Sequence, residues 1–118
     1  MNSLFYGCSL LSSIKLDSFD TSKVLDMSYM FYDCWSLTSV DLSNFDTSNV
    51  QKFDSMFYNC REFKFLSVIN FNTKNMESMS SMFHGCSFIE TLDLSQFNTE
   101  KVSHMDDLLF LLNLCKYN

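Results

Sequence analysis

The chain has 118 residues, of which 47% are hydrophobic, and it carries 14 acidic and 8 basic side chains for a net charge of −6. This length and apolar content predict one folded domain with a continuous core and exclude a disordered chain. Because the few Lys and Arg residues form no basic stripe that could neutralise phosphates, nucleic acid is not expected as a partner.

Membrane insertion and export are not predicted from the residues either. The longest uninterrupted apolar run, residues 108–112, is far shorter than the roughly 20 residues that cross a bilayer. Residues 1–8 lack the charged start, the long apolar run and the small-residue cleavage site of a secretory signal. We therefore expect no membrane span and no leader in this chain.

A period of 26 residues organises the sequence. The repeated columns are Cys8, Cys34, Cys60 and Cys86; Phe19, Phe45, Phe71 and Phe97; and Thr21, Thr47, Thr73 and Thr99. The period predicts one repeat domain over residues 1–118, with a partial unit at 1–7 and full units at 8–33, 34–59, 60–85 and 86–111. Residues 112–118 form a degenerate tail, and we expect the chain to be a fragment of a longer array.

Each unit is predicted to begin with a short strand. In unit 8–33 the apolar residues Leu11, Ile14 and Leu16 end in an alternating pair, which is typical of a strand with one buried face. The Phe19, Asp20 and Thr21 corner follows, and its polar oxygens can accept hydrogen bonds from the unpaired N–H groups at a helix start. A strand and a capped corner are therefore expected in every unit.

The last part of each unit is predicted to be a short helix. Val24, Met27, Met30 and Phe31 lie at positions i, i+3, i+6 and i+7, which is the apolar stripe of a helix with one buried side. The expected fold class is therefore α/β. The predicted architecture is a leucine-rich-repeat-like right-handed solenoid, with a short parallel strand plus a short helix in each 26-residue coil.

A known consensus matches the repeat. Residues 40–50, with the flanking segments 30–34 and 56–60, resemble the repeats of BspA-like bacterial surface proteins. The same 26-residue repeat defines a domain of unknown function found in bacterial lipoproteins and surface proteins. The resemblance extends to Leu109 and implies an atypical leucine-rich-repeat fold, a location at the cell surface or secretion, and adhesion or binding to host proteins.

The cysteine column is predicted to consist of buried structural thiols. The Cα atoms of equivalent cysteines in neighbouring coils would lie about 4.8 Å apart. Parallel side chains would keep the Cβ atoms near that distance, which is farther than the ~3.8 Å that a disulfide prefers. There is no Cys-x-x-Cys pair, and His84 and His104 fall in different columns, so no metal and no cofactor are expected. His84 and Cys86 could form a reactive thiolate pair, but tyrosines occupy the His84 column in the other units, which favours a surface aromatic position.

Outward positions of the predicted strands are the natural recognition surface of such a repeat. The candidate binding face consists of Lys15, Asp41, Phe65, Ser67, Ile69 and Asp93. Phe65 and Ile69 break its polar character, and either burial by a partner or drift in a decaying copy explains them.

The function favoured by these patterns is a non-catalytic protein-interaction or adhesion module with a host or cell-surface protein as partner. Two alternatives stay open: a truncated, non-functional repeat fragment, and a thiol-based enzyme around Cys86 or Cys115. Uncapped apolar ends further predict self-association of the chain. The residues at the carboxyl-terminal end are Leu108, Leu109, Phe110, Leu111 and Leu114.

Overall fold

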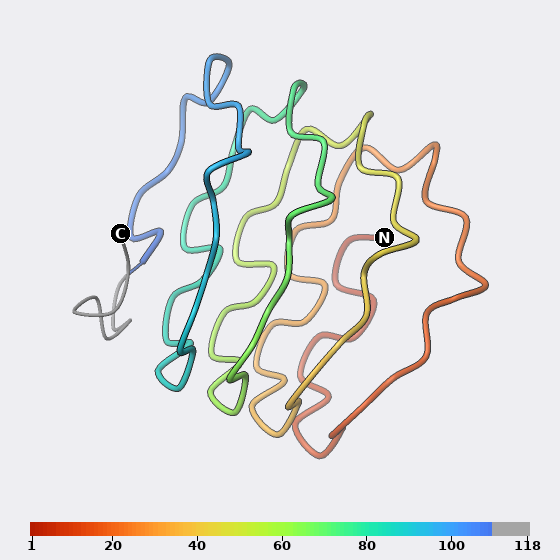
Figure 1. The fold of residues 1–118 in the computed structure, drawn as a ribbon, viewed down its shortest axis with the longest axis vertical. Coiled ribbons are helices and arrows are strands. Elements are labelled where there is room, and N and C mark those ends of the chain that lie inside the picture. The colour runs from red at the N-terminus through yellow and green to blue at the C-terminus, as the bar shows by residue number, and fades with distance from the viewer. Residues whose placement is uncertain (110–118) are drawn as a thin grey trace.

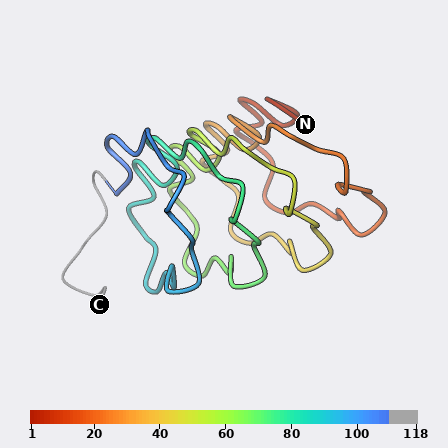
Figure 2. The same ribbon diagram turned by 90° about the horizontal axis from the view of Figure 1, so that it is seen from above.

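The computed structural model describes residues 1–109. The chain runs through successive circuits that lie side by side, and the residue number increases steadily from one edge of the stack to the other (Figure 1). A view turned by 90° shows the same order of circuits (Figure 2). We call these circuits coil 1 (8–33), coil 2 (34–59), coil 3 (60–85) and coil 4 (from 86), with residues 1–7 preceding coil 1. The whole measures 32 × 29 × 20 Å with a radius of gyration of 13.0 Å, which is compact.

The predicted secondary structure is wrong. Residues 1–109 contain no helix and no strand of more than one residue, and strand-like pairing is limited there to isolated parallel bridges. These bridges join Asp26 to Lys52, Lys52 to Ser78, Ser78 to His104, and Phe65 to Thr91. The α/β leucine-rich-repeat-like solenoid, with a short strand and a short helix in each coil, is therefore not the fold of this chain. Within the described residues there is also no helix that could cross a membrane.

A run of tight turns stands where a helix was predicted. In residues 53–60 the N–H of Met56 donates to the carbonyl oxygen of Phe53 (3.2 Å), and the N–H of Tyr58 donates to that of Ser55 (3.1 Å). The N–H of Cys60 likewise donates to Phe57 (3.2 Å). These are bonds over three residues, and only every second N–H makes one.

The intervening N–H groups reach the next coil. Those of Phe53, Ser55, Phe57 and Asn59 donate to the carbonyl oxygens of Ser78, Ser80, Met82 and His84, at 3.0, 2.9, 3.0 and 2.8 Å. The same offset of 25 residues recurs in the segments before and after. An α-helix would spend these N–H groups on its own carbonyls four residues back. Bonding between coils thus takes the donors that a helix would need.

This bonding pattern depends on left-handed backbone at two positions of each coil. The first position holds Ser3, Tyr29, Ser55, Ser81 and Asp107, and the second holds Gly7, Asp33, Asn59 and Gly85. Their φ angles lie between 52° and 74°, whereas an α-helix requires φ near −63°. A positive φ is uncommon for a residue with a side chain. Each of coils 1–3 therefore contains two left-handed residues in this segment, and a regular α-helix contains none.

The predicted strands form few bonds between coils. In this region the N–H of Thr38 donates to Ser12 (3.2 Å) and the N–H of Glu90 donates to Lys64 (2.9 Å). A parallel strand pair would have evenly spaced bonds along its length. Inter-coil bonding is denser at the opposite side, where for example the N–H of Gln51 donates to Leu25 (2.8 Å).

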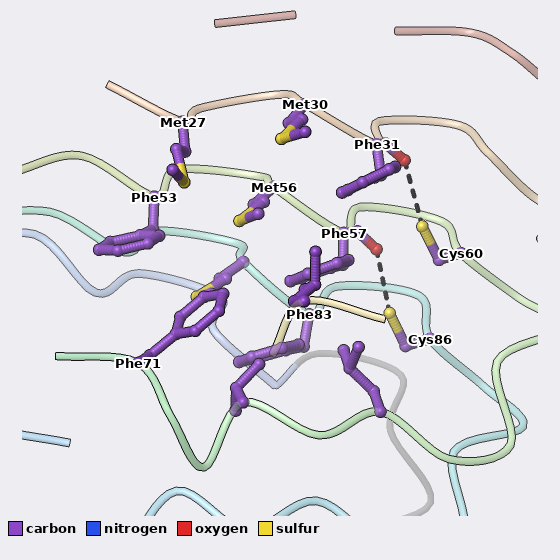
Figure 3. Packing of buried hydrophobic residues seen from close by; sticks show 14 of the residues in the cluster. Met27, Met30, Phe31, Phe53, Met56, Phe57, Cys60, Phe71, Phe83 and Cys86 are labelled. Atoms are coloured by element: carbon purple, nitrogen blue, oxygen red, sulfur yellow. Dashed lines mark hydrogen bonds between the residues drawn. The ribbon is translucent and has the colours of Figure 1, made fainter. Parts of the chain in front are cut away.

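The core lies inside the coils and is built from the apolar columns of the repeat. Phe31, Phe57 and Phe83 are fully buried, and their rings stack with centroids 5.6 and 5.8 Å apart (Figure 3). Buried methionines lie beside them at Met30, Met56 and Met82. The apolar spacing thus identified core residues correctly although it predicted the wrong backbone.

The carboxyl-terminal prediction is only partly covered by the structure. Leu108 and Leu109 are half-buried and pack against the core. Phe110, Leu111, Leu114 and Cys115, together with the predicted tail 112–118, lie outside the described residues. Self-association through uncapped ends therefore stays a prediction.

Gly85 and Gly7 offer a matched pair for testing the left-handed positions. A Cβ on Gly85 would meet Asn59 Oδ1 at 2.3 Å, whereas a Cβ on Gly7 would meet nothing within 4 Å. We expect Gly85→Ala to lower the free energy of unfolding by about 2–3 kcal/mol and Gly7→Ala by about 1 kcal/mol. Urea unfolding followed by circular dichroism measures both values. Equal losses for the two variants would contradict the close contact, and Asn59→Gly should restore part of the stability of Gly85→Ala.

Candidate functional site

Three of the four described cysteines are buried inside the coils. The Cys34, Cys60 and Cys86 thiols are free and donate hydrogen bonds to carbonyl oxygens 29 residues earlier in the chain, while Cys8 is exposed. The bond from Cys60 ends on Phe31 (3.1 Å) and that from Cys86 ends on Phe57 (3.0 Å), as Figure 3 shows. The cysteine column thus links segments of the chain that are slightly more than one 26-residue repeat apart.

Burial also keeps these thiols protonated. Desolvation raises the pKa of Cys34 to about 11 and that of Cys86 to about 12, and it raises the pKa of Cys60 well above its usual value. A nucleophilic cysteine needs the opposite shift, because the thiolate is the reactive form. The His84 ring stacks on Tyr58 with centroids 4.4 Å apart, in the column of surface aromatics. The thiol chemistry considered for Cys86 is therefore disfavoured, and Cys115 lies outside the described residues.

The threonine column links the coils through buried hydroxyl groups. The Thr47 hydroxyl donates to the carbonyl oxygen of Asn72 (3.2 Å) and accepts from the N–H of the same residue (2.8 Å). Thr21 makes the equivalent pair of bonds to Asp46. The neighbouring Asp46 carboxylate accepts from the N–H of Ser48 (2.9 Å), two residues on. These corner oxygens do accept backbone N–H groups, but they serve a turn and the adjacent coil instead of a helix start.

The phenylalanine column is buried in the middle of the stack. Phe45 and Phe71 are each only 4% exposed, whereas Phe19 is exposed and Phe97 is half-buried near the two ends of the described chain. This column therefore contributes to the core and is almost fully buried in the central coils.

The candidate binding face is exposed at every predicted position. Lys15, Asp41, Phe65, Ser67, Ile69 and Asp93 all lie at the surface. Phe65 is 63% exposed and Ile69 is 46% exposed. Asp41 and Ser67 line a common hollow of about 180 Å³, together with Ser43 and Asn70. The structure therefore joins coils 2 and 3 of the predicted face into one concave surface.

The register places coil 4 beside this surface and leaves Lys15 farther away. The parallel bridge between Phe65 and Thr91 aligns coil 3 with coil 4. Asp93 follows Thr91 by two residues, as Ser67 follows Phe65, so Asp93 lies next to Ser67. Lys15 belongs to coil 1, where it occupies the position equivalent to Asp41, and it lies two coils from Ser67. The patch formed by Asp41, Phe65, Ser67, Ile69 and Asp93 is named the outer patch below.

The two carboxylates of the outer patch also have a local role. Asp41 accepts a hydrogen bond from the N–H of Ser43 and Asp93 accepts one from the N–H of Ser95, both at 2.9 Å. Hydrogen bonds from these serines lower the pKa of each carboxyl group. Both side chains are therefore ionised at neutral pH while they shape a turn.

A second, partly exposed surface was not predicted as a site. The rings of Tyr6, Tyr32, Tyr58 and His84 stack at centroid distances of 4.7, 4.5 and 4.4 Å. Trp35 is 44% exposed, and the guanidinium of Arg61 lies 5.8 Å from its ring centroid. Tyr, Trp and Arg are the residue types enriched at interface hot spots. The signal was present in the sequence as aromatic residues at the 26-residue period, next to the only tryptophan.

No group of three or more His, Cys, Asp or Glu side chains comes together as a metal site within residues 1–109. What the geometry of this region does define is a repeating structure whose polar side chains link neighbouring coils. In a sequence comparison, a family model described as "Mycoplasma protein of unknown function, DUF285" matches residues 1–87 and 64–113. The chain belongs to this family.

Two further comparisons found no relative, since no curated protein and no solved structure matches the chain. The resemblance to a domain of unknown function is confirmed by the family match. The BspA-like leucine-rich-repeat part of that resemblance has no support from these comparisons.

Replacing a buried threonine measures how much the hydrogen bonds between coils contribute to the free energy of unfolding. Thr47→Val keeps the shape of the side chain but leaves the N–H and carbonyl of Asn72 without the hydroxyl. We expect a loss of about 1–3 kcal/mol in the free energy of unfolding, the typical cost of unpaired buried polar groups. Thr99→Val is the control because Thr99 is exposed. Urea unfolding that shows no difference between the two variants would contradict the role of the hydroxyl.

The thiols should differ sharply in reactivity. In a Cys115→Ser background at neutral pH, we expect Ellman's reagent to react rapidly with the exposed Cys8 only. Cys34, Cys60 and Cys86 should react at the rate of unfolding, because their pKa values are raised and their side chains are buried. Mass spectrometry identifies the labelled residue. Labelling of Cys86 as fast as that of Cys8 would revive the thiol-enzyme alternative.

Proposed function

We propose that this chain is a non-catalytic protein-interaction module that uses the outer patch as its contact surface. The observation that carries the proposal is the exposure of two apolar side chains, Phe65 and Ile69, on an otherwise polar face. Adhesion at the cell surface, or after secretion, is the biological setting that we propose, in line with the BspA-like surface proteins that the repeat resembles. Its partner would be a host or cell-surface protein.

The fold does not require apolar side chains at these two positions. The positions equivalent to Phe65 hold Ser13, Ser39 and Thr91, and those equivalent to Ile69 hold Asp17, Ser43 and Ser95. All six residues are exposed, so polar side chains occupy the same backbone positions in the other coils. Phe65 and Ile69 therefore serve no shared structural purpose, which supports a role in binding.

The free energy available from covering this pair is sufficient for a weak interaction anchor. Full burial of a Phe or Ile side chain gains about 1.5–3 kcal/mol. Roughly half of each side chain is exposed, so a partner that covers both would gain roughly 2–3 kcal/mol. The hollow lined by Asp41, Ser67 and Asn70 adds a small concave surface with polar side chains.

The aromatic surface around Trp35 and Tyr32 supports the same class of function. Stacking holds the tyrosine rings in fixed positions one coil apart, so little conformational entropy would be lost when a partner covers them. Rigid aromatic side chains give a large contact area per ordered residue. A module with two such surfaces could hold a partner that extends over both.

Selection from a phage-displayed random peptide library tests the proposal. We expect clones selected on the immobilised wild-type chain to lose at least tenfold in binding to the Phe65→Ser, Ile69→Ser double variant, since the apolar anchor is removed. Leu10→Ser is the matched control, because Leu10 is 91% exposed and lies outside the outer patch.

The double variant should unfold at the same urea concentration as the wild type, because both side chains are exposed. Failure to select any clone, or equal binding of the clones to the double variant, would contradict a contact surface at the outer patch.

A further inference from the structure

The outer patch has the form of a cross centred on Ser67. Along coil 3, the exposed Phe65 and Ile69 lie two residues before and two residues after Ser67. Across the coils, Asp41 lines the same hollow as Ser67, and the register set by the Phe65–Thr91 bridge brings Asp93 to its other side. A small hydroxyl side chain thus lies between two apolar groups in one direction and two carboxylates in the other.

The carboxylates are available to a partner. In each case Oδ1 accepts the hydrogen bond from the serine N–H, and the carboxyl group is exposed, so a cation can approach it from solvent. Other charges near the patch belong to Lys15, which occupies the coil 1 position equivalent to Asp41, and to Lys64 and Glu90, whose backbones are hydrogen-bonded to each other. Together with Asp41 and Asp93, these five side chains carry a net charge of −1. With a net charge of −6 for the chain, the long-range field also attracts a positive partner.

The geometry points to an extended basic segment as the occupant of the outer patch: a lysine or arginine, then an apolar residue, then a second lysine or arginine, at alternate positions of one protein strand. This inference rests on the proposed function and specifies its partner. The apolar side chain would contact Phe65 and Ile69 above Ser67, and the two cations would pair with Asp41 and Asp93.

The dimensions agree with that occupant. Surface rings of neighbouring coils repeat at 4.5–4.7 Å, so Asp41 and Asp93, two coils apart, lie about 9–10 Å apart in a stack of strand-like spacing. Side chains four residues apart on one side of an extended strand are separated by about 13 Å. The long, flexible stems of Lys and Arg readily cover the difference of about 3 Å.

Nuclear magnetic resonance titration with defined peptides tests the inference. The probes are capped peptides with the core Lys-Ser-Phe-Ser-Lys, its charge reversal Glu-Ser-Phe-Ser-Glu, and the apolar-free Lys-Ser-Ser-Ser-Lys. We expect the first peptide to shift the amide signals of residues 65–69, Asp41 and Asp93 at low salt. The other two should bind at least fivefold more weakly, and the preference for lysine should shrink at high salt.

The matched variants separate charge from structure. Asp41→Asn with Asp93→Asn removes both charges but keeps an oxygen for the serine N–H, as Asn72 and Asn98 show at the corner column, where they accept such bonds. Asp46→Asn is the control, since Asp46 makes the same kind of bond away from the patch. We expect a roughly five- to tenfold rise in the Kd of the lysine peptide for the double variant and no change for the control.

Each outcome decides between the two proposals. Equal binding of the lysine and glutamate peptides at the patch, abolished in the Phe65→Ser, Ile69→Ser variant, would overturn the basic partner and leave the apolar contact surface intact. Shifts confined to other residues, or no shifts with any peptide, would overturn the inference, while the library selection still decides whether the surface binds proteins at all.

Discussion

The hydrogen bonds from alternate N–H groups to the next coil are the constraint on which the rest of the structure depends. They fix the spacing of the coils, so that the phenylalanine and tyrosine rings of neighbouring coils stack. They also require two left-handed residues in each coil, and this requirement excludes a helix in the segment whose side chains have helical spacing. Because a bond of this kind needs a neighbouring coil, a single 26-residue unit could not hold its own conformation, and stability has to come from stacking.

The sequence predicted which residues are buried far better than it predicted the backbone. The columns around Met30 and Phe31 were assigned to the core from their spacing, and both side chains are fully buried. The same spacing predicts a helix, because a period of three to four residues is compatible both with a helix and with successive turns over three residues. A signal for turns was present in the column of Gly7, Asp33, Asn59 and Gly85, since these residue types tolerate a positive φ. Tyr29 has φ 58°, and nothing about a tyrosine indicates that conformation.

For the candidate site, too, the sequence predicted the exposure of side chains better than their arrangement in space. The exposure of Phe65 and Ile69 followed from alternation along the chain and needed no three-dimensional information. The hollow shared by Asp41 and Ser67, and the position of Asp93, depend on the register between coils, which no single coil contains. The aromatic surface near Trp35 was missed because its rings come from different coils and become one surface only when the coils are stacked.

The polar side chains that recur at the 26-residue period form hydrogen bonds that maintain the fold. The Cys60 thiol, the Thr47 hydroxyl and the Asp46 carboxylate each bond to a backbone group, so side chains that could perform chemistry hold the chain together instead. Such a scaffold restricts the inward and corner positions strongly and leaves the outward strand-like positions almost unrestricted, because an exposed side chain there contributes little to stability. Recognition can then change by substitution on a face whose backbone stays constant. Phe65 and Ile69, which lie on opposite sides of the line from Asp41 to Asp93, are substitutions of this kind. The specificity of this chain is therefore to be sought where its sequence departs from its own period.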